Sequence, residues 1–157
     1  MKKTVEERFW EKIDKTGECW LWTGACDSGG YGQFWRDGGM VRAHRLSFEW
    51  VHGGIPEGMH VDHRCHTRNC VRPDHLRLVT QAQNLQNLRG AYSNNATGVR
   101  GVYWHKATQK YRARVMLNGK RYHAGYYDTL EEAEAAAIAK RSELFTHDDY
   151  ADWAASA

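Results

Sequence analysis

Residues 61–75 read VDHRCHTRNCVRPDH and place three soft metal ligands at even spacing, namely Cys65, Cys70 and His75. Thiolates and imidazoles at such short separations are the ligands with which a chain closes a tetrahedral zinc site. His63 lies two residues before the first ligand, so a zinc-binding loop would hold its backbone in place. Asn84 follows nine residues after His75, where a helix could bring an amide oxygen back towards His63. The pattern predicts a structural zinc and, beside it, a second and harder cation that takes part in chemistry.

The run His-x-Cys-x4-Cys-x4-His, followed by Asn nine residues later, resembles the His-Cys box and HNH branch of the ββα-metal (His-Me finger) nucleases. Three upstream segments, at residues 19–24, 30–32 and 43–45, resemble those that precede this box in phage-type HNH endonucleases. The resemblance covers residues 19–89. It implies that His63 is the general base, that Asn84 binds the catalytic metal, and that the zinc ligands include Cys65, Cys70 and His75.

The fourth zinc ligand of such proteins is an upstream cysteine, and this chain offers Cys19 and Cys26. We expect Cys19, because it fits the family pattern and stands in an expected strand. Cys26 lies in a glycine-rich turn, where a free thiol is the simpler interpretation.

A length of 157 residues allows one or two small domains. With 26% charged residues and a mean hydropathy of -0.76, a small core stapled by metal fits better than a large one. The sequence has no apolar run of about 18 residues, so no membrane span is expected, and its N-terminus lacks the apolar stretch of a signal peptide. The four cysteines beside clustered histidines indicate metal binding in a reducing cytoplasm. If a phage encodes the protein, that cytoplasm is the one of its bacterial host. Disulfide pairing is the alternative.

Hydrophobic periodicity and turn residues predict an α+β domain at residues 1–90, and the resemblance implies that it is a nuclease domain. A helix is expected at 4–15, where Thr4 and Glu7 have the spacing of a capping box, and another at 43–52. Short strands are expected at residues 19–22, 31–35, 40–42, 59–63 and 76–79. Thr80 then caps a helix at 81–88. The order strand, loop, strand, helix is that of a zinc-stabilised ββα-metal motif.

Three more polar residues are candidates for this centre. His44 and Arg45 stand in the first turn of the expected helix 43–52. A buried, hydrogen-bonded histidine is the simpler interpretation of His44, whereas Arg45 is suited to hold the cleaved phosphate, with a surface arginine as the alternative. Asp62 is expected to bind magnesium together with Asn84. Adjacent residues on a regular strand point to opposite faces, so Asp62 and His63 share a site only if the strand bends.

Residues 91–98 have the composition of a linker, and residues 99–146 form a second expected domain, followed by an unassigned tail at 147–157. Three antiparallel strands are expected at 99–105, 110–117 and 120–127, the last two joined by the hairpin pair Asn118-Gly119. A helix rich in Glu and Ala is expected at 130–145. Alternation turns Val102, Trp104, Ala113, Val115 and Leu117 towards this helix.

The opposite face of the expected sheet is basic and aromatic. Residues 94–127 contain seven Lys or Arg and no Asp or Glu. Residues 100–102, Arg-Gly-Val, and 125–133, GYYDTLEEA, resemble the opening strand and the strand-to-helix junction of AP2 DNA-binding domains. The resemblance implies that a sheet enters the DNA major groove. The expected DNA contacts are Arg100, Tyr103, His105, Arg112, Arg114, Arg121 and His123.

These features together predict a metal-dependent DNA endonuclease. His63 would take a proton from water, and Mg²⁺ or another divalent cation, held by Asn84 and Asp62, would act at the scissile phosphate. Zinc on thiolates is a closed structural site and is expected to stay outside the reaction. The resemblance implies a homing-type enzyme that acts on double-stranded DNA. The sequence leaves open whether it nicks or cleaves both strands and whether it is a monomer or a homodimer. The alternative is a non-catalytic, zinc-stabilised DNA-binding regulator, which leaves His63 and Asn84 without a role.

Overall fold

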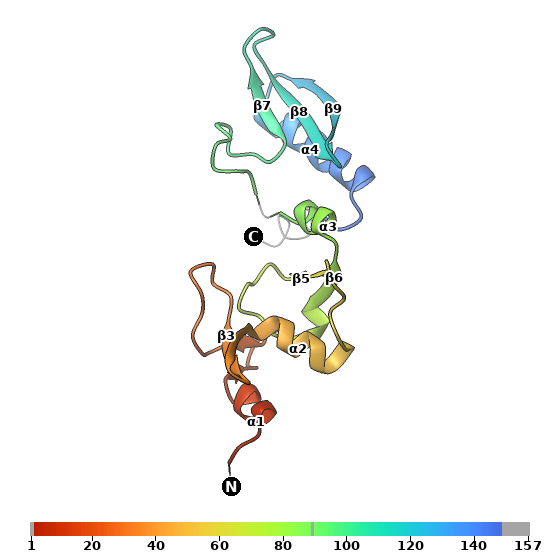
Figure 1. The fold of residues 1–157 in the computed structure, drawn as a ribbon. Coiled ribbons are helices and arrows are strands. Elements are labelled where there is room, and N and C mark those ends of the chain that lie inside the picture. Colours follow the sequence, from red (N-terminus) through yellow and green to blue (C-terminus); the bar gives the residue numbers. More distant parts are fainter. Residues whose placement is uncertain (1, 89, 149–157) are drawn as a thin grey trace. The chain divides into compact units, whose positions relative to one another are not determined.

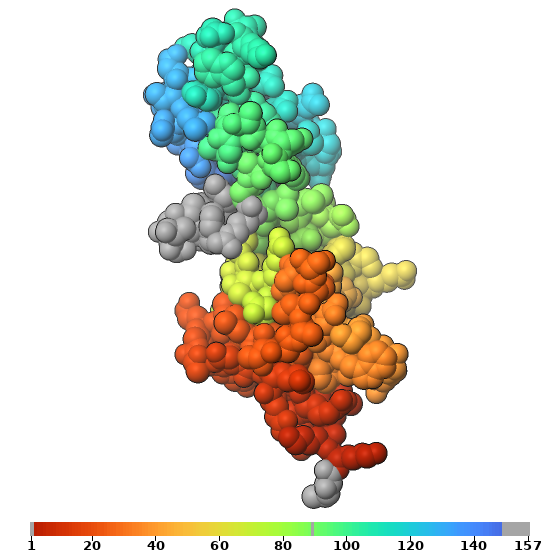
Figure 2. All heavy atoms as spheres, turned by 90° about the vertical axis from the view of Figure 1, so that its left-hand side faces the viewer, coloured from red at the N-terminus to blue at the C-terminus, as the bar shows by residue number. Residues whose placement is uncertain are grey.

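The computed structural model describes residues 2–88 and 90–148 of the chain. The chain divides into two compact units, Met1–Gln81 and Ala82–Ala157, which can be followed by colour as ribbons in Figure 1 and as spheres in Figure 2. The expected linker, residues 91–98, falls within the second unit, and the expected domain extents of 1–90 and 99–146 stay a prediction. The expected tail lies outside the described residues from position 149 onwards. Among the described residues, no helix is long and apolar enough to cross a membrane.

The N-terminal helix is shorter than the sequence pattern predicts. Helix α1 spans Val5–Trp10 and begins with the expected capping box of Thr4 and Glu7. Its expected continuation to residue 15 is wrong, because β1, Ile13–Asp14, pairs antiparallel with β2, Leu21–Trp22. Strand β2 is also shorter than expected and leaves Cys19 in the preceding bend. A tertiary pairing thus replaces the last turn of the predicted helix.

A β-hairpin and a helix form the centre of the first unit. Strand β3, Gln33–Arg36, pairs with β4, Gly39–Arg42, and α2 follows at once as Ala43–His52, with the predicted bounds. Their apolar side chains pack with α1 and β2 into one core, whose buried members are Phe9, Trp22, Phe34, Ala43, Leu46 and Val71. Gly32 permits this packing, because a Cβ at that position would lie 2.6 Å from the Trp22 ring.

The second hairpin of this unit carries the residues of interest. Strand β5, His60–His63, pairs antiparallel with β6, Leu76–Val79, in regular register from His60 opposite Val79 to His63 opposite Leu76. The loop between them ends in a short 3₁₀ helix, Pro73–His75. His63 and His75 therefore stand at the same end of the hairpin, on either side of the loop.

The second unit contains a three-stranded antiparallel sheet and one covering helix (Figure 1). The strands are β7, Val102–His105, β8, Lys110–Leu117, and β9, Lys120–Tyr127. The turn at Asn118-Gly119 has φ of 50° and 76°, as the predicted two-residue hairpin requires. Helix α4, Leu130–Leu144, is capped by Thr129 and Glu132 and packs on one face of the sheet.

The core between sheet and helix is small, and its buried members are Val102, Ala113, Ala133 and Ala137. The alternation predicted for β8 is correct at Ala113 and Val115, which are buried. It fails at Trp104, which is 44% exposed and packs edge-on against Tyr111 instead of against α4. The short helix α3, Gln81–Gln86, precedes this sheet and belongs to the second unit from Ala82 onwards.

Candidate metal centre and nucleic-acid interface

A cluster of three cysteines and one histidine lies at the loop between β5 and β6. The ligand atoms of Cys19, Cys65, Cys70 and His75 all lie within 4.8 Å of one another. The Sγ atoms of Cys19 and Cys70 are 3.6 and 3.7 Å from Nδ1 of His75. A tetrahedron with Zn–S bonds of about 2.3 Å and Zn–N bonds of about 2.05 Å has an S–N edge of about 3.6 Å. These four side chains therefore fit a zinc ion.

Backbone pairing explains how Cys19 reaches a loop so distant in sequence. Leu21 and Cys70 form an antiparallel bridge. Two backbone hydrogen bonds flank it, from Val71 N–H to the carbonyl of Trp20 at 2.8 Å and from Trp22 N–H to the carbonyl of Asn69 at 2.9 Å. The segment after Cys19 is thus aligned with the segment around Cys70. Cys26 is exposed and lies outside the cluster, so of the two candidates Cys19 is the one that joins it.

The thiols are electrostatically arranged for a cation. A hydrogen bond from the Cys70 thiol lowers the pKa of Cys65 to about 4. The same interaction raises the pKa of Cys70, and burial raises that of Cys19. Burial, the hydrogen bond of Cys70 to Cys65 and, to a smaller extent, repulsion by the Cys65 thiolate thus keep these two thiols protonated. A divalent cation removes this repulsion and allows all three to ionise, which is the state in which thiolates bind zinc.

His63 lies next to this cluster with a fixed orientation. Its ring is buried, and Nε2 lies 3.0 Å from the carbonyl oxygen of Cys70. A carbonyl only accepts hydrogen bonds, so Nε2 carries the proton and the lone pair of the neutral ring is on Nδ1. Burial lowers the pKa of His63 below its ordinary value of 6.5, against the hydrogen bond to Cys70, which raises it. The imidazole is consequently neutral at pH 7 and able to accept a proton.

His44 is buried, as the sequence pattern predicts, and lies beside His63. Its ring centroid lies 4.7 Å from that of His63, and its side chain is 3% exposed. Burial lowers the pKa of His44 to about 3, helped by the nearby charges of His63, Arg42 and Arg45. The expected hydrogen bond is missing at Nδ1, which is buried and has no partner among the described residues. The position of His44 next to Arg45, in the segment that resembles HNH endonucleases, is the feature of the sequence that places it near this centre.

Aromatic and basic side chains surround the two histidines. The Tyr31 ring lies 5.4 Å from His44 and 6.0 Å from His63. The guanidinium groups of Arg42 and Arg68 lie over the Tyr31 ring, at 4.6 and 5.8 Å from its centroid. The hairpin β3–β4 and the zinc loop thus each contribute a positive charge next to the same aromatic ring. Such a surrounding suits a phosphate group.

Asp62, an expected magnesium ligand, lies opposite Arg77 in the structure. Strand β5 is regular, and the burial of its residues alternates, with His63 buried and Asp62 half-buried. Asp62 faces Arg77 across the hairpin, and Nε and Nη2 of Arg77 both donate to one carboxylate oxygen of Asp62, at 3.1 and 3.0 Å. Adjacent side chains leave a regular strand on opposite faces, so this register favours Arg77 as the neighbour of Asp62. The expected role of Asp62 as a magnesium ligand stays a prediction.

The sheet of the second unit presents a basic aromatic face on the side away from α4. Arg114 lies over the ring of Tyr103, 4.3 Å from its centroid, and the rings of His105 and His123 contact Tyr126 at 5.2 and 4.8 Å. Tyr103 pairs across the sheet with Arg112, and Arg121 with Met116. We define this basic aromatic face as Tyr103, His105, Arg112, Arg114, Arg121, His123 and Tyr126.

Two family models match segments of this chain. The model of the HNH endonuclease family matches residues 41–86, and that of the AP2 domain matches residues 97–147. Protein 3.8 of Escherichia phage T7 is 31% identical over 101 residues, which cover 64% of this chain and 80% of that protein. The chain is a phage-type HNH-family protein with an AP2 domain. A nuclease or DNA-binding function follows at the level of these families.

Two further relatives of this HNH-family protein are known from the same phage. Protein 7.7 is 37% identical over 71 residues, which cover 45% of this chain and 55% of that protein. Protein 2.8 is 36% identical over 83 residues, which cover 51% of this chain and 56% of that protein. The chain therefore spans about half the length of both proteins. No solved structure matches it.

One expected DNA contact of the HNH-family protein, Arg100, has backbone partners. The guanidinium of Arg100 is not on the basic aromatic face. It donates to the backbone carbonyls of Leu88 and Gln86, both at 2.7 Å, and its side chain is 13% exposed. The carbonyls of Gln86 and Leu88 thus already accept donors of Arg100, and its contact with DNA stays a prediction.

Asn84, the expected metal ligand, stands on α3 and is described with the second unit. Its carbonyl accepts a hydrogen bond from the N–H of Asn87 at 3.3 Å, which closes the end of the helix. The order β5, β6, α3 agrees with the strand, strand, helix order of the predicted motif. The role of Asn84 in a ββα-metal centre stays a prediction.

Proposed function

We propose that this protein is a metal-dependent DNA endonuclease of the homing type, which hydrolyses phosphodiester bonds in double-stranded DNA. The state of His63 supports the proposal most strongly. Its imidazole is buried and neutral, and its Nε2 is committed to the carbonyl of Cys70. A general base needs its lone pair oriented and its pKa near or below the working pH. In this role Nδ1 of His63 takes a proton from the attacking water.

His44 and Arg45 have the chemistry to bind the scissile phosphate in this proposal. The neutral His44 ring can donate one hydrogen bond to a phosphate oxygen, and its buried Nδ1 has no partner among the described residues. Arg45 follows it in the first turn of α2 and is half-buried. A guanidinium binds two phosphate oxygens at once, which would hold the phosphate in line for attack.

Asn84 is the proposed ligand of a catalytic cation, Mg²⁺ or another divalent ion. An amide oxygen is a hard ligand of the kind that such ions prefer, unlike the thiols of the zinc cluster. When bound, the cation would stabilise negative charge on the leaving oxygen. Asp62 is not proposed as a second ligand, because Arg77 binds its carboxylate. The remaining ligands would be water and the phosphate itself.

The basic aromatic face is the proposed site of duplex binding. Its arginines lie on adjacent strands with aromatic rings between them, a combination suited to phosphates and base edges in the major groove. The alternative function is a DNA-binding regulator without catalysis. It accounts for this face and for the zinc cluster, but it gives no reason to bury two neutral histidines side by side.

A nicking assay on supercoiled plasmid tests the proposal. We expect the full chain to convert plasmid to open circles in Mg²⁺ or Mn²⁺ and to stop in EDTA, while His63→Ala and Asn84→Ala lose most of this activity. Cys26→Ser is the matched control, since Cys26 is exposed and outside the cluster. Binding of duplex DNA without cutting in any divalent cation would favour the regulator.

A further inference from the structure

Helix α3 needs support from outside itself. It has only six residues, Gln81–Gln86, and helices this short do not form alone in water. The carbonyls at its C-terminal end also lack partners within the helix. Its proposed metal ligand, Asn84, lies in the last turn, so the position of that side chain depends on how this end is held.

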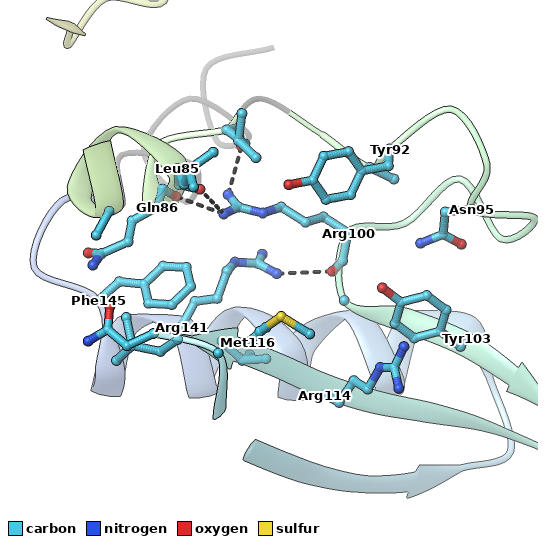
Figure 3. A pocket seen from close by; sticks show the side chains of 18 residues that line it. Leu85, Gln86, Tyr92, Asn95, Arg100, Tyr103, Arg114, Met116, Arg141 and Phe145 are labelled. Atoms are coloured by element: carbon cyan, nitrogen blue, oxygen red, sulfur yellow. Dashed lines mark hydrogen bonds between the residues drawn. The ribbon is translucent and has the colours of Figure 1, made fainter. Parts of the chain in front are cut away.

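Arg100 holds the C-terminal end of α3. Its guanidinium donates to three backbone carbonyls, two of which belong to Leu85 and Gln86 (Figure 3). Nη1 donates to the carbonyl of Leu88 at 2.7 Å, and Nη2 donates to those of Gln86 and Leu85 at 2.7 and 3.4 Å. A positive charge at this end of a helix also complements the helix dipole. Arg100 thus acts as a C-terminal cap that comes from the strand region of the AP2 domain.

Arg100 is itself fixed from the side of α4. Its carbonyl accepts a hydrogen bond from Nη1 of Arg141 at 3.0 Å (Figure 3). Arg141 is 2% exposed and pairs through Nε with Asp148 at 3.1 Å, and the other oxygen of Asp148 lies 3.6 Å from Nη1 of Arg100. This buried chain of charges leaves the Arg100 side chain little freedom to move.

Gln86 makes a second, independent connection. Its side chain is buried, and its Oε1 accepts hydrogen bonds from the N–H groups of Thr146 and His147, at 3.0 and 3.3 Å. The residues just after α4 therefore bind the last residue of α3 directly. Two side chains, Arg100 and Gln86, together join both ends of the AP2 fold to one short helix.

The helix also adjoins the DNA-binding surface. A pocket of about 310 Å³ is lined on one side by Leu85, Gln86 and Leu88 and on another by Tyr103 and Arg114 (Figure 3). Tyr103 and Arg114 belong to the basic aromatic face. Arg100, which orders α3, thus lies in the same unit as the proposed duplex contacts.

We infer that the AP2 domain positions the catalytic metal ligand, with Arg100 and Gln86 as positioning residues for Asn84. This inference rests on the proposed endonuclease function. The AP2 domain then has two tasks, since it binds duplex through its sheet and orders the helix that carries Asn84. Outer-shell groups that orient a metal ligand change metal affinity or activity by about 10–100-fold when removed.

The experiment compares full-length Arg100→Ala, Arg100→Lys and Gln86→Ala with Arg121→Ala, whose side chain is exposed on the basic aromatic face. Hydrogen–deuterium exchange of residues 81–88 is measured without metal, duplex affinity is measured against salt in EDTA, and nicking is measured against Mg²⁺ concentration. We expect Arg100→Ala and Gln86→Ala to speed exchange at 81–88 and to raise the Mg²⁺ concentration at half-maximal rate by about 10-fold or more. Arg100→Lys should recover part of both effects.

The salt dependence separates positioning from DNA contact. Arg121→Ala should flatten the salt slope and leave the Mg²⁺ requirement and the exchange of α3 unchanged. Arg100→Ala should leave the salt slope unchanged, raise the Mg²⁺ requirement and speed the exchange of α3. Wild-type exchange at 81–88 in both Arg100→Ala and Gln86→Ala, or a flattened salt slope with a normal Mg²⁺ requirement in Arg100→Ala, would overturn the inference. If Arg100→Ala does not fold, Gln86→Ala alone decides between these outcomes, because it leaves the Arg100 network intact.

Failure of the proposed function gives a different pattern. In that case wild-type protein does not cut, or Asn84→Ala cuts with the wild-type Mg²⁺ requirement. Failure of the inference alone leaves wild-type cutting and the Asn84→Ala defect in place.

Discussion

The Nε2 atom of His63 donates a hydrogen bond of 3.0 Å to the carbonyl oxygen of Cys70, and the thiol of Cys70 belongs to the Cys3His cluster. One residue thus takes part in the metal cluster through its side chain and orients the proposed base through its backbone. A metal that orders the loop would thereby fix the tautomer of His63. Cys70 therefore couples the order of the Cys3His cluster to the orientation of His63.

The first prediction concerns the proposed base. His63→Ala should lower the nicking rate by about 100-fold or more, the range that general base catalysis contributes. Duplex affinity should stay near the wild-type value, because the proposed DNA-binding face lies in the other unit. Single-turnover nicking and a gel-shift titration measure the two quantities. Cutting at the wild-type rate would show that His63 is not the base.

The second prediction concerns the Cys3His cluster. Purified protein should contain about one tightly bound zinc ion per chain, and its removal should unfold the first unit, since binding free energy at a thiolate site is folding free energy. Cys70→Ser should have the same effect, whereas Cys26→Ser should not, because Cys26 is exposed and outside the cluster. Elemental analysis and thermal denaturation provide the measurements. Zinc-free protein that melts normally would contradict this prediction.

The third prediction is a pH dependence of the cleavage rate. Burial lowers the pKa of His63 below 6.5, so its base form persists to a lower pH than in an exposed histidine. The single-turnover rate should therefore fall to half its maximum at a pH below 6.5, as Nδ1 becomes protonated. His44, with a pKa of about 3, should remain neutral across this range. A rate that already declines by half between pH 8 and 7 would argue against a buried, neutral base.

The fourth prediction concerns the basic aromatic face. Arg114→Ala and Arg121→Ala should each reduce the log–log slope of duplex affinity against salt by about 0.9 if they contact a phosphate. A contact to a base edge should instead cost about 1–3 kcal/mol at one position of the target site. Lys140→Ala is the control, because Lys140 lies on α4, which packs on the opposite face. Duplex affinity measured from low to high salt distinguishes these cases. If both arginine variants have the same slope as the Lys140→Ala control, this face is excluded as the duplex site.

Much of the local structure could be predicted from the sequence. Helix α2 and the strands β6, β8 and β9 have the predicted bounds, and the turn at Asn118-Gly119 has the predicted backbone conformation. These elements depend on signals within a few residues, such as alternation, caps and glycine at positive φ. The ligand spacing in residues 61–75 is equally local, because a short loop must close around one ion.

Long-range pairing decided the rest. Cys19 reaches the cluster because Leu21 pairs with Cys70, and the predicted helix after Trp10 gives way to β1 because Ile13 pairs with Trp22. Asp62 was assigned to the metal from its neighbour in sequence, but the register of a two-stranded ladder sets it opposite Arg77. Arg100 was assigned to DNA from the AP2 resemblance, yet its guanidinium also caps a helix twelve or more residues away. A charge in the sequence says what a side chain can bind, whereas its partner is chosen by whichever opposite group the fold brings within about 3 Å.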